Sequence, residues 1–352
     1  MSKSVRCGNV IIGGGAPLSI QSMTNVDTRN VEGVVTQIKQ LEEAGCDIVR
    51  LAVPDMEAAE AFSKIKKQVV VPLVADIHFD HRLAIAAMKN GADKVRINPG
   101  NIGRIDRVKA VVETAKERGI PIRVGVNSGS LEKDIVQQYG GVTAAGLAES
   151  TLRNVKLLEE LDFEDIVISL KASDVRLNYE AHKLVFENTN HPLHIGITEA
   201  GTVNSGKLKS AVGIGALLLA GIGDTMRISL TGDPVREVHF AKELLKTIGI
   251  RPSGVNLVSC PTCGRTRVDL EGIALQIEKA LEDVEKQREL KSLPRITVAV
   301  MGCAVNGPGE AKEADFGVAC GEGKGVLFAK GKIVKTVSEN EIVNELLQLI
   351  KE

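Results

Sequence analysis

The sequence has no tryptophan, and aromatic residues make up only 3% of its 352 positions. Proteins that bind nucleic acid bases commonly stack them on aromatic side chains, so a surface of that kind is not expected. The formal net charge is −1 at pH 7, and no overall positive field attracts nucleic acid or acidic membranes. A preference for an anionic ligand must therefore come from a local cluster of cations.

Long hydrophobic runs are also missing. The most apolar stretch, residues 211–222, is rich in glycine and shorter than the roughly 20 residues of a membrane span. The first ten residues lack the apolar core of a secretion signal. Without such a signal, six cysteines favour metal binding or redox chemistry over a disulfide framework. We therefore expect a cytoplasmic protein that acts neither on nucleic acid nor in a membrane.

Short apolar runs alternate with amphipathic segments through most of the chain. The runs predicted as strands are Leu18–Met23, Asp47–Val53, Pro72–Ile77, Lys94–Pro99, Pro121–Asn127, Asp165–Lys171, Pro192–Glu199 and Thr225–Gly232. The segments predicted as helices include Val31–Glu43, Glu57–Lys67, Arg82–Asn90, Arg107–Arg118, Leu147–Leu161 and Val235–Thr247. This alternation predicts parallel strands covered by helices.

Eight such units over roughly 230 residues match an α/β fold of the (β/α)₈ barrel type. A doubly wound open sheet is the alternative, but it places a glycine-rich turn after its first strand. Here the glycine run at residues 13–15 precedes that strand, and we interpret it as a turn in a small N-terminal hairpin closing the barrel floor. After about residue 250 cysteine and glycine become dense. We therefore predict a barrel domain at 1–250 and a smaller α+β domain at 251–352.

Cations recur at the predicted strand ends, where active sites of such barrels lie. The cations are Arg50, Arg96, Arg123, Lys171 and Arg227, and the amides Asn98 and Asn127 accompany them. A single arginine in a strand is commonly paired with a nearby acid, but five at matching positions exceed the acids expected there. Guanidinium groups bind phosphate oxygens with two hydrogen bonds. We therefore favour a site for two phosphates, or a diphosphate, over purely structural pairing.

Three residues at the same ends are candidates for acid–base catalysis. Asp76 and His78 follow the third predicted strand, and Glu199 ends the seventh. Histidine commonly carries protons near neutral pH, although a hydrogen-bonded loop histidine is an equally good interpretation of His78. Glu199 among so many cations is expected to stay ionised.

Cysteines form the second motif. Cys260 and Cys263 make a CxxC, which alone fits zinc, a redox dithiol or a cluster. Cys303 adds a third thiolate, and no second CxxC or CxxH completes a zinc ribbon. Three cysteines in glycine-rich surroundings suit a [4Fe–4S] cluster. Glu310, the first acid after a Gly-Pro-Gly turn, is the candidate for the fourth ligand.

These motifs resemble the bacterial 4-hydroxy-3-methylbut-2-enyl diphosphate synthase family. The segments that carry the resemblance include Ser259–Arg265 and Gly302–Ala311, and in the barrel Gln21–Asn25, Ala75–Phe79, Arg96–Asn101, Gly196–Gly201 and Gly221–Thr225. The resemblance covers nearly the whole chain, and the two cysteine motifs together are highly specific.

The resemblance implies that 2-C-methyl-D-erythritol 2,4-cyclodiphosphate is the substrate. It also implies that ferredoxin or flavodoxin supplies two single electrons, and that Cys260, Cys263, Cys303 and Glu310 hold the cluster. The barrel would be dihydropteroate-synthase-like, and the second domain similar to cluster domains of sulfite and nitrite reductases. The family forms homodimers. A non-redox iron–sulfur dehydratase and an iron–sulfur carrier or sensor are the alternatives, and the ring of cations argues against the latter.

Overall fold

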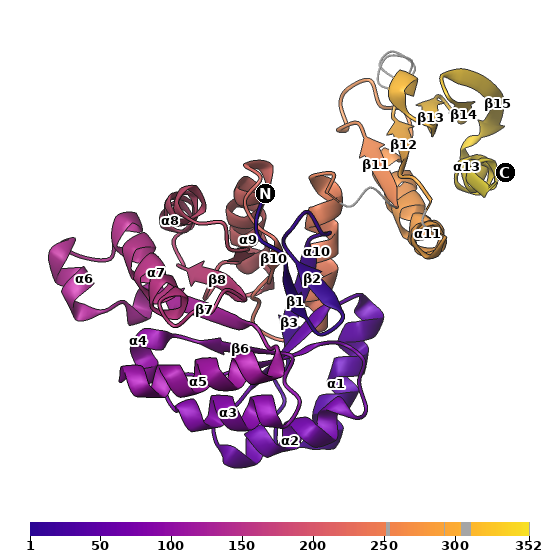
Figure 1. Cartoon of the computed structure of the whole chain (residues 1–352). Coiled ribbons are helices and arrows are strands. Elements are labelled where there is room, and N and C mark those ends of the chain that lie inside the picture. Colours follow the sequence, from indigo (N-terminus) through magenta and orange to yellow (C-terminus); the bar gives the residue numbers. More distant parts are fainter. Residues whose placement is uncertain (251–253, 292, 304–310, 352) are drawn as a thin grey trace. The chain divides into compact units, whose positions relative to one another are not determined.

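The structure is a computed structural model that describes residues 1–250, 254–291, 293–303 and 311–351. The chain divides into two compact units, Met1–Leu244 and Leu245–Glu352. Figure 1 shows the first as strands ringed by helices and the second as a sheet with helices of its own. Each unit is described separately below. Among the described residues, no helix combines the length and apolarity needed to cross a bilayer.

Eight parallel strands form the barrel of the first unit. They are β3 (Ser19–Met23), β4 (Ile48–Ala52), β5 (Leu73–Asp76), β6 (Lys94–Ile97), β7 (Ile122–Asn127), β8 (Ile166–Lys171), β9 (His194–Ile195) and β10 (Thr225–Met226). The order is β8-β7-β6-β5-β4-β3-β10-β9, and a bridge between Ile168 and Leu193 joins the two ends. The predicted (β/α)₈ barrel is therefore confirmed, with β9 and β10 much shorter than the predicted runs.

Helices connect successive strands on the outside of the barrel (Figure 1). They are α1 (Val31–Ala44), α2 (Met56–Lys66), α3 (His81–Lys89), α4 (Pro99–Ile102), α5 (Ile105–Arg118), α6 (Lys133–Gln138), α7 (Ala144–Glu159), α8 (Val175–Asn188), α9 (Val203–Leu219) and α10 (Val235–Thr247), with a 3₁₀ turn at Ser128–Ser130. Local signals set their ends: the Asp55 side chain accepts from the Ala58 amide at the start of α2, and left-handed Gly45 and Gly119 end α1 and α5.

Helices α8 and α9 were not among those predicted. The sequence of α9 is apolar on most sides and contains glycine, so it lacks the polar face that reveals a surface helix. Gly213 has a packing reason, because a Cβ atom there would lie 2.6 Å from the Ile197 side chain. The glycine allows the helix to approach the loop that follows β9.

The N-terminal hairpin closes one end of the barrel. Strands β1 (Val5–Cys7) and β2 (Val10–Ile12) pair antiparallel, and their turn lies at Gly8 and Asn9. The hairpin residues Cys7 and Ile12 pack against barrel residues near the starts of β4, β5 and β8 in one buried cluster. The glycine run predicted to form the turn instead follows β2, and all three of its residues have positive φ.

The second unit contains a five-stranded mixed sheet. Its elements are β11 (Val255–Ser259), α11 (Leu270–Leu290), β12 (Ile296–Met301), β13 (Phe316–Gly321), β14 (Lys324–Ala329), β15 (Lys332–Ser338) and α13 (Ile342–Lys351), with 3₁₀ turns at Ala311–Glu313 and Glu339–Glu341. Strands β11, β12 and β13 run parallel, and β13, β14 and β15 antiparallel. Helices α11 and α13 bury Ile277 and Leu346 against Val298 of the sheet.

Candidate active site

Strand register gathers the predicted cations inside the barrel. Asp76 lies beside Arg96, and Arg96 beside Arg123, on neighbouring strands, while Lys171 lies beside Asn127. Residues opposite one another on parallel strands point to the same face. Arg96, Arg123 and Lys171 are buried, and Arg123 reaches Gln21 of β3, so these charges lie inside the barrel. Lys171 ends β8, whereas Arg123 is the second residue of β7.

Asp76 is the acid at the centre of this group. Its carboxylate lies 3.5 Å from Arg96 Nη1, 3.9 Å from Arg50 Nε and 3.4 Å from His78 Nε2. Burial alone would raise the pKa of Asp76, but Arg50, the hydrogen bond from His78 and Arg96 outweigh it and hold this pKa far below its ordinary value. Asp76 is therefore a permanent anion, and the side chain of His78 beside it is mostly exposed.

The buried cations have more positive charge than their neighbours neutralise. Burial lowers the pKa of Arg123 and of Lys171 well below the ordinary values, and Arg50 lowers both further by repulsion. Arg123 Nη1 donates to the Gln21 side chain at 3.3 Å, while its buried Nε has no hydrogen-bond partner in the part of the chain that the structure describes. An anion with several oxygens would relieve both the repulsion and the missing hydrogen bond.

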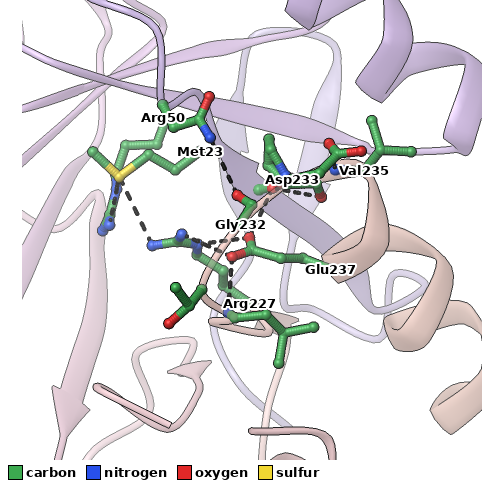
Figure 2. A network of polar contacts seen from close by, with 12 residues as sticks. Met23, Arg50, Arg227, Gly232, Asp233, Val235 and Glu237 are labelled. Atoms are coloured by element: carbon green, nitrogen blue, oxygen red, sulfur yellow. Dashed lines mark hydrogen bonds and ion pairs between the residues drawn. The ribbon is translucent and has the colours of Figure 1, made fainter. Parts of the chain in front are cut away.

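Glu237 on α10 is a site residue that the sequence analysis missed. Its carboxylate pairs with Arg227 at 3.2 and 3.3 Å, and it accepts from Ser22 Oγ at 2.9 Å and from the Leu230 amide at 3.0 Å (Figure 2). The side chain is 4% exposed. The sequence contained a signal for this residue. Glu237 lies on the same buried face of α10 as Ala241 and the leucines that follow, and a charged residue is unusual on such a face.

Met23 is the second such residue. It ends β3 and is in register with Arg50 on β4. Its sulfur accepts from Arg50 Nε at 3.0 Å and Nη2 at 2.9 Å, and Arg227 Nη1 approaches to 3.8 Å (Figure 2). The formal charges of this group, counted with every member ionised, sum to +3: Asp76 and Glu237 against Arg50, Arg96, Arg123, Lys171 and Arg227.

The remaining predicted site residues of the barrel differ from the cations in burial and in their contacts. Asn98 is buried, and its side-chain oxygen accepts from the Gly100 amide at the start of α4, which is a structural role. Asn127 is half-buried at the end of β7. Glu199 is exposed in the loop after β9 with φ of +51°, a strained backbone for a glutamate and one that often marks functional positions.

Lys94 at the start of β6 was not predicted as a site residue. Its side chain is fully buried, and Nζ has no hydrogen-bond partner among the described residues. Burial lowers the pKa of Lys94 to about 8, against an attraction to Cys7 in the hairpin, and burial also raises the pKa of the Cys7 thiol. This amine therefore lies in the closed end of the barrel, with the hairpin rather than with Asp76.

In the second unit, two of the three predicted cysteine ligands follow neighbouring parallel strands. Ser259 is in register with Val300, so Cys260 after β11 and Cys303 after β12 lie at the same edge of the sheet. The Cys260 amide donates to the Val300 carbonyl at 3.3 Å, and the Gly302 amide donates to Cys260 Sγ at 3.1 Å. A backbone amide directed at sulfur is the contact that iron–sulfur thiolates receive.

Cys263 lies in an exposed turn after Cys260. Its amide donates to Thr266 Oγ1 at 3.2 Å, and the Arg265 amide and the Arg265 charge lower the pKa of the Cys263 thiol. Glu310 falls outside the described residues. Within the described ranges, no three His, Cys, Asp or Glu side chains are grouped closely enough for a metal ion.

Three further cysteines are buried thiols. Burial raises the pKa of Cys46 to about 12 and that of Cys320 to about 11, and Cys7 is raised for the same reason. Thiols of this kind stay protonated and behave as small apolar side chains. The sequence analysis did not assign them to the site.

The fold resembles solved barrel structures of low sequence identity. A dihydropteroate synthase from Stenotrophomonas maltophilia matches with a TM-score of 0.51 and 17% identity, covering 70% of this chain and 97% of that chain. At this identity the likeness concerns the fold alone, and the predicted dihydropteroate-synthase-like barrel agrees with it.

Sequence comparisons cover both units. The family model described as the GcpE TIM-barrel domain matches residues 2–242, and the GcpE protein C-terminal domain matches residues 256–352. A relative from Caldanaerobacter subterraneus subsp. tengcongensis is 56% identical over 100% of this chain and 97% of its own length, and one from Clostridium perfringens is 54% identical over 99% and 98%. Both are named 4-hydroxy-3-methylbut-2-en-1-yl diphosphate synthase (flavodoxin), and this chain belongs to the same GcpE family of enzymes.

Proposed function

We propose that this enzyme opens the ring of 2-C-methyl-D-erythritol 2,4-cyclodiphosphate and forms 4-hydroxy-3-methylbut-2-enyl diphosphate, an isoprenoid precursor. Two electrons and one proton are consumed, and one substrate oxygen leaves as water. The observation that carries the proposal is the excess of buried positive charge inside the barrel, which matches a diphosphate. The names of full-length relatives support the same reaction.

The side chains proposed to bind the diphosphate lie in, or directly after, five strands of the barrel. Arg96, Arg123 and Lys171 form the buried part of this set, and Arg50 and Arg227 are its half-buried members. Burial excludes water from the ion pairs and so strengthens them. Asn127 ends β7 in register with Lys171, close enough to the cations to donate to the same ligand.

Proton transfer is assigned to residues near the open end. His78 donates to Asp76, which keeps the imidazole in one orientation, while its exposed edge stays accessible to a ligand. Glu199 is held by a strained backbone in the loop after β9 and is available to orient a hydroxyl or pass a proton. Asp76 orients His78 and two arginines and does not itself exchange protons.

The cysteine edge is proposed to hold a [4Fe–4S] cluster through Cys260, Cys263 and Cys303, with Glu310 as the fourth ligand of the resting state. When bound, such a cluster supplies single electrons and an iron able to act as a Lewis acid. The chain itself contributes the amide of Gly302 to one thiolate and a lowered pKa at Cys263. Residues 1–250 are then the substrate-binding domain, and residues 251–352 the cluster domain.

The electron donor and the assembly also belong to this proposal. Flavodoxin stands in the names of the relatives, and ferredoxin is the alternative one-electron donor. The family resemblance further supports a homodimer, which a measurement of the molecular mass in solution tests. It also supports a cytoplasmic location.

The deciding experiment is anaerobic purification of the full chain, followed by iron and sulfide analysis and an assay with the cyclic diphosphate. We expect about four irons and four sulfides per chain, and turnover that depends on a low-potential reductant. Loss of water from the cyclic diphosphate without reductant, to a product two electrons more oxidised than 4-hydroxy-3-methylbut-2-enyl diphosphate, would instead support the non-redox dehydratase. A chain that binds iron and sulfide but does not convert the cyclic diphosphate would contradict the proposed reaction.

A further inference from the structure

The group of cations in the barrel contains an uncharged acceptor between two of its arginines. Met23 Sδ lies 3.0 and 2.9 Å from Arg50 Nε and Nη2, and 3.8 Å from Arg227 Nη1 (Figure 2). The fork of Arg50 thus directs two N–H groups at one thioether, and a second guanidinium faces the same atom. This is the arrangement in which guanidinium groups hold an oxygen of phosphate or carboxylate.

A thioether is a poor partner for that arrangement. Methionine sulfur is a weak acceptor and carries no charge, so it neutralises neither arginine. The Asp76 carboxylate is 3.9 Å from Arg50 Nε, beyond hydrogen-bond distance. Burial lowers the pKa of Arg50 to about 10, Asp76 raises it in part, and repulsion from Arg227 lowers it again. The site therefore gains considerably when an anionic oxygen replaces the sulfur.

Arg227 is held so that its free edge points at this position. Glu237 binds Nε at 3.3 Å and Nη2 at 3.2 Å, which leaves Nη1 as the atom directed at Met23. Glu237 is fixed in turn by Ser22 and by the Leu230 amide. The guanidinium of Arg227 is thus immobilised from behind, and the side chain able to move is Met23.

Met23 has the properties of a movable side chain. It is the one residue of β3 that is not fully buried, and it lies at the carboxyl end, where the barrel opens. Methionine is unbranched and changes rotamer at little cost. Its neighbours Gln21 and Ser22 are buried and held by hydrogen bonds.

We propose that Met23 is a gate in the anion subsite formed by Arg50 and Arg227: its sulfur occupies the subsite in the free enzyme, and a phosphoryl oxygen of the ligand displaces it. This inference rests on the proposed function for the identity of the ligand. It deepens that function by making Met23 a residue that sets ligand affinity through competition rather than through contact with the ligand.

If the Met23 sulfur competes with the ligand, two substitutions of similar size should change the affinity for pyrophosphate in opposite directions. Met23→Leu removes the acceptor of Arg50 Nε and Nη2 and of Arg227 Nη1 in the free enzyme, so pyrophosphate binds about fivefold tighter. Met23→Gln supplies an amide oxygen, a better acceptor than sulfur, so pyrophosphate binds about fivefold more weakly. A Met23 side chain that stayed in place and oriented the arginines would give weaker binding for Met23→Leu.

The experiment is isothermal titration of pyrophosphate into the anaerobically purified full chain and its variants. The order of affinity expected is Met23→Leu, then wild type, then Met23→Gln. The exposed residue Met56 on α2 provides a matched control, and Met56→Leu should leave the affinity unchanged. Thermal unfolding of each variant verifies that the fold is retained.

The outcomes separate the gate from the reaction. Unchanged or weaker binding by Met23→Leu overturns the gate, even if the wild type converts the cyclic diphosphate. The expected order in a chain that fails to convert the cyclic diphosphate supports the gate and overturns the reaction. A wild type that does not bind pyrophosphate overturns the gate together with the anion pocket of the proposed function.

Discussion

The barrel pocket and the cysteine edge are two ways of preparing a site. In the barrel, Arg96 and Arg123 belong to strands and are buried with their charges already facing the pocket. In the second unit, Cys260 and Cys303 lie just beyond their strands, and Cys263 is in an exposed turn. The comparison shows that side chains which bind an anion can belong to the strands themselves. Cysteines proposed to coordinate iron lie instead in the loops that follow the strands.

The most severe test of this division is Cys303→Ser. We expect loss of the visible absorbance of the cluster and of all reductive turnover, because serine is a poor iron ligand. Pyrophosphate affinity should stay at the wild-type value if the barrel pocket is independent. Cys320→Ala, which removes a buried thiol from the same unit, serves as the control and should keep the absorbance.

Substitution of Lys94 measures how much the buried ammonium group lowers the stability of the barrel. Its pKa is lowered to about 8 from 10.5, so below pH 8 the folded state must hold a buried ammonium group that the unfolded state solvates. We expect Lys94→Met to raise the free energy of unfolding by about 3 kcal/mol at pH 7.

This gain should shrink as the pH rises from 8 to 10.5, because the folded wild type is then neutral and the cost of removing the proton from the unfolded chain falls as the pH approaches 10.5. Chemical denaturation at pH 7 and pH 9.5 measures it, and Lys89→Met at the exposed end of α3 is the control. A destabilised Lys94→Met variant at pH 7 would show that the ammonium has a favourable partner.

Substitution of Arg123 tests the pocket alone. Removing one charged hydrogen-bonding group should weaken pyrophosphate binding roughly 30-fold, equal to about 2 kcal/mol. The absorbance of the cluster should not change. Arg123→Met preserves the length of the side chain, and Arg118→Met at the exposed end of α5 is the matched control. Loss of the absorbance would mean that the two regions are not independent.

Glu237→Gln has the smallest expected effect. The amide keeps one hydrogen bond to Arg227 but removes the charge that orients it, so KM should rise about tenfold with little change in kcat. Glu57→Gln on the surface of α2 is the comparison. A fall in kcat with constant KM would instead place Glu237 in the chemical steps.

Sequence reasoning predicted the parts of the fold that depend on local pattern. Apolar runs located all eight strands, and the cations at their ends were found because charge is unusual there. The lengths of β9 and β10 were wrong. In the predicted run Pro192–Glu199, a Cβ at Gly196 would lie 2.7 Å from the Arg227 carbonyl, and Glu199 has positive φ, so the chain leaves the extended conformation.

The residues that were missed depend on contacts between distant segments. Met23 is an ordinary apolar residue until the register sets it beside Arg50, and Arg227 approaches it from a strand about 200 positions later. Glu237 is a stronger case, because an acid on the inward stripe of a predicted helix demands a cation. Lys94 was included in a predicted strand but does not reach the pocket, since it lies at the opposite end of that strand from Asn98.

During synthesis, the hairpin at the barrel floor is made before the barrel residues against which it packs. Cys7 and Ile12 leave the ribosome before the strand residues that cover them, and one of these, Val167, follows about 160 positions later. Contacts of such long separation form slowly. The apolar side chains of the hairpin therefore stay uncovered while most of the barrel is translated, which leaves them open to aggregation until the barrel closes.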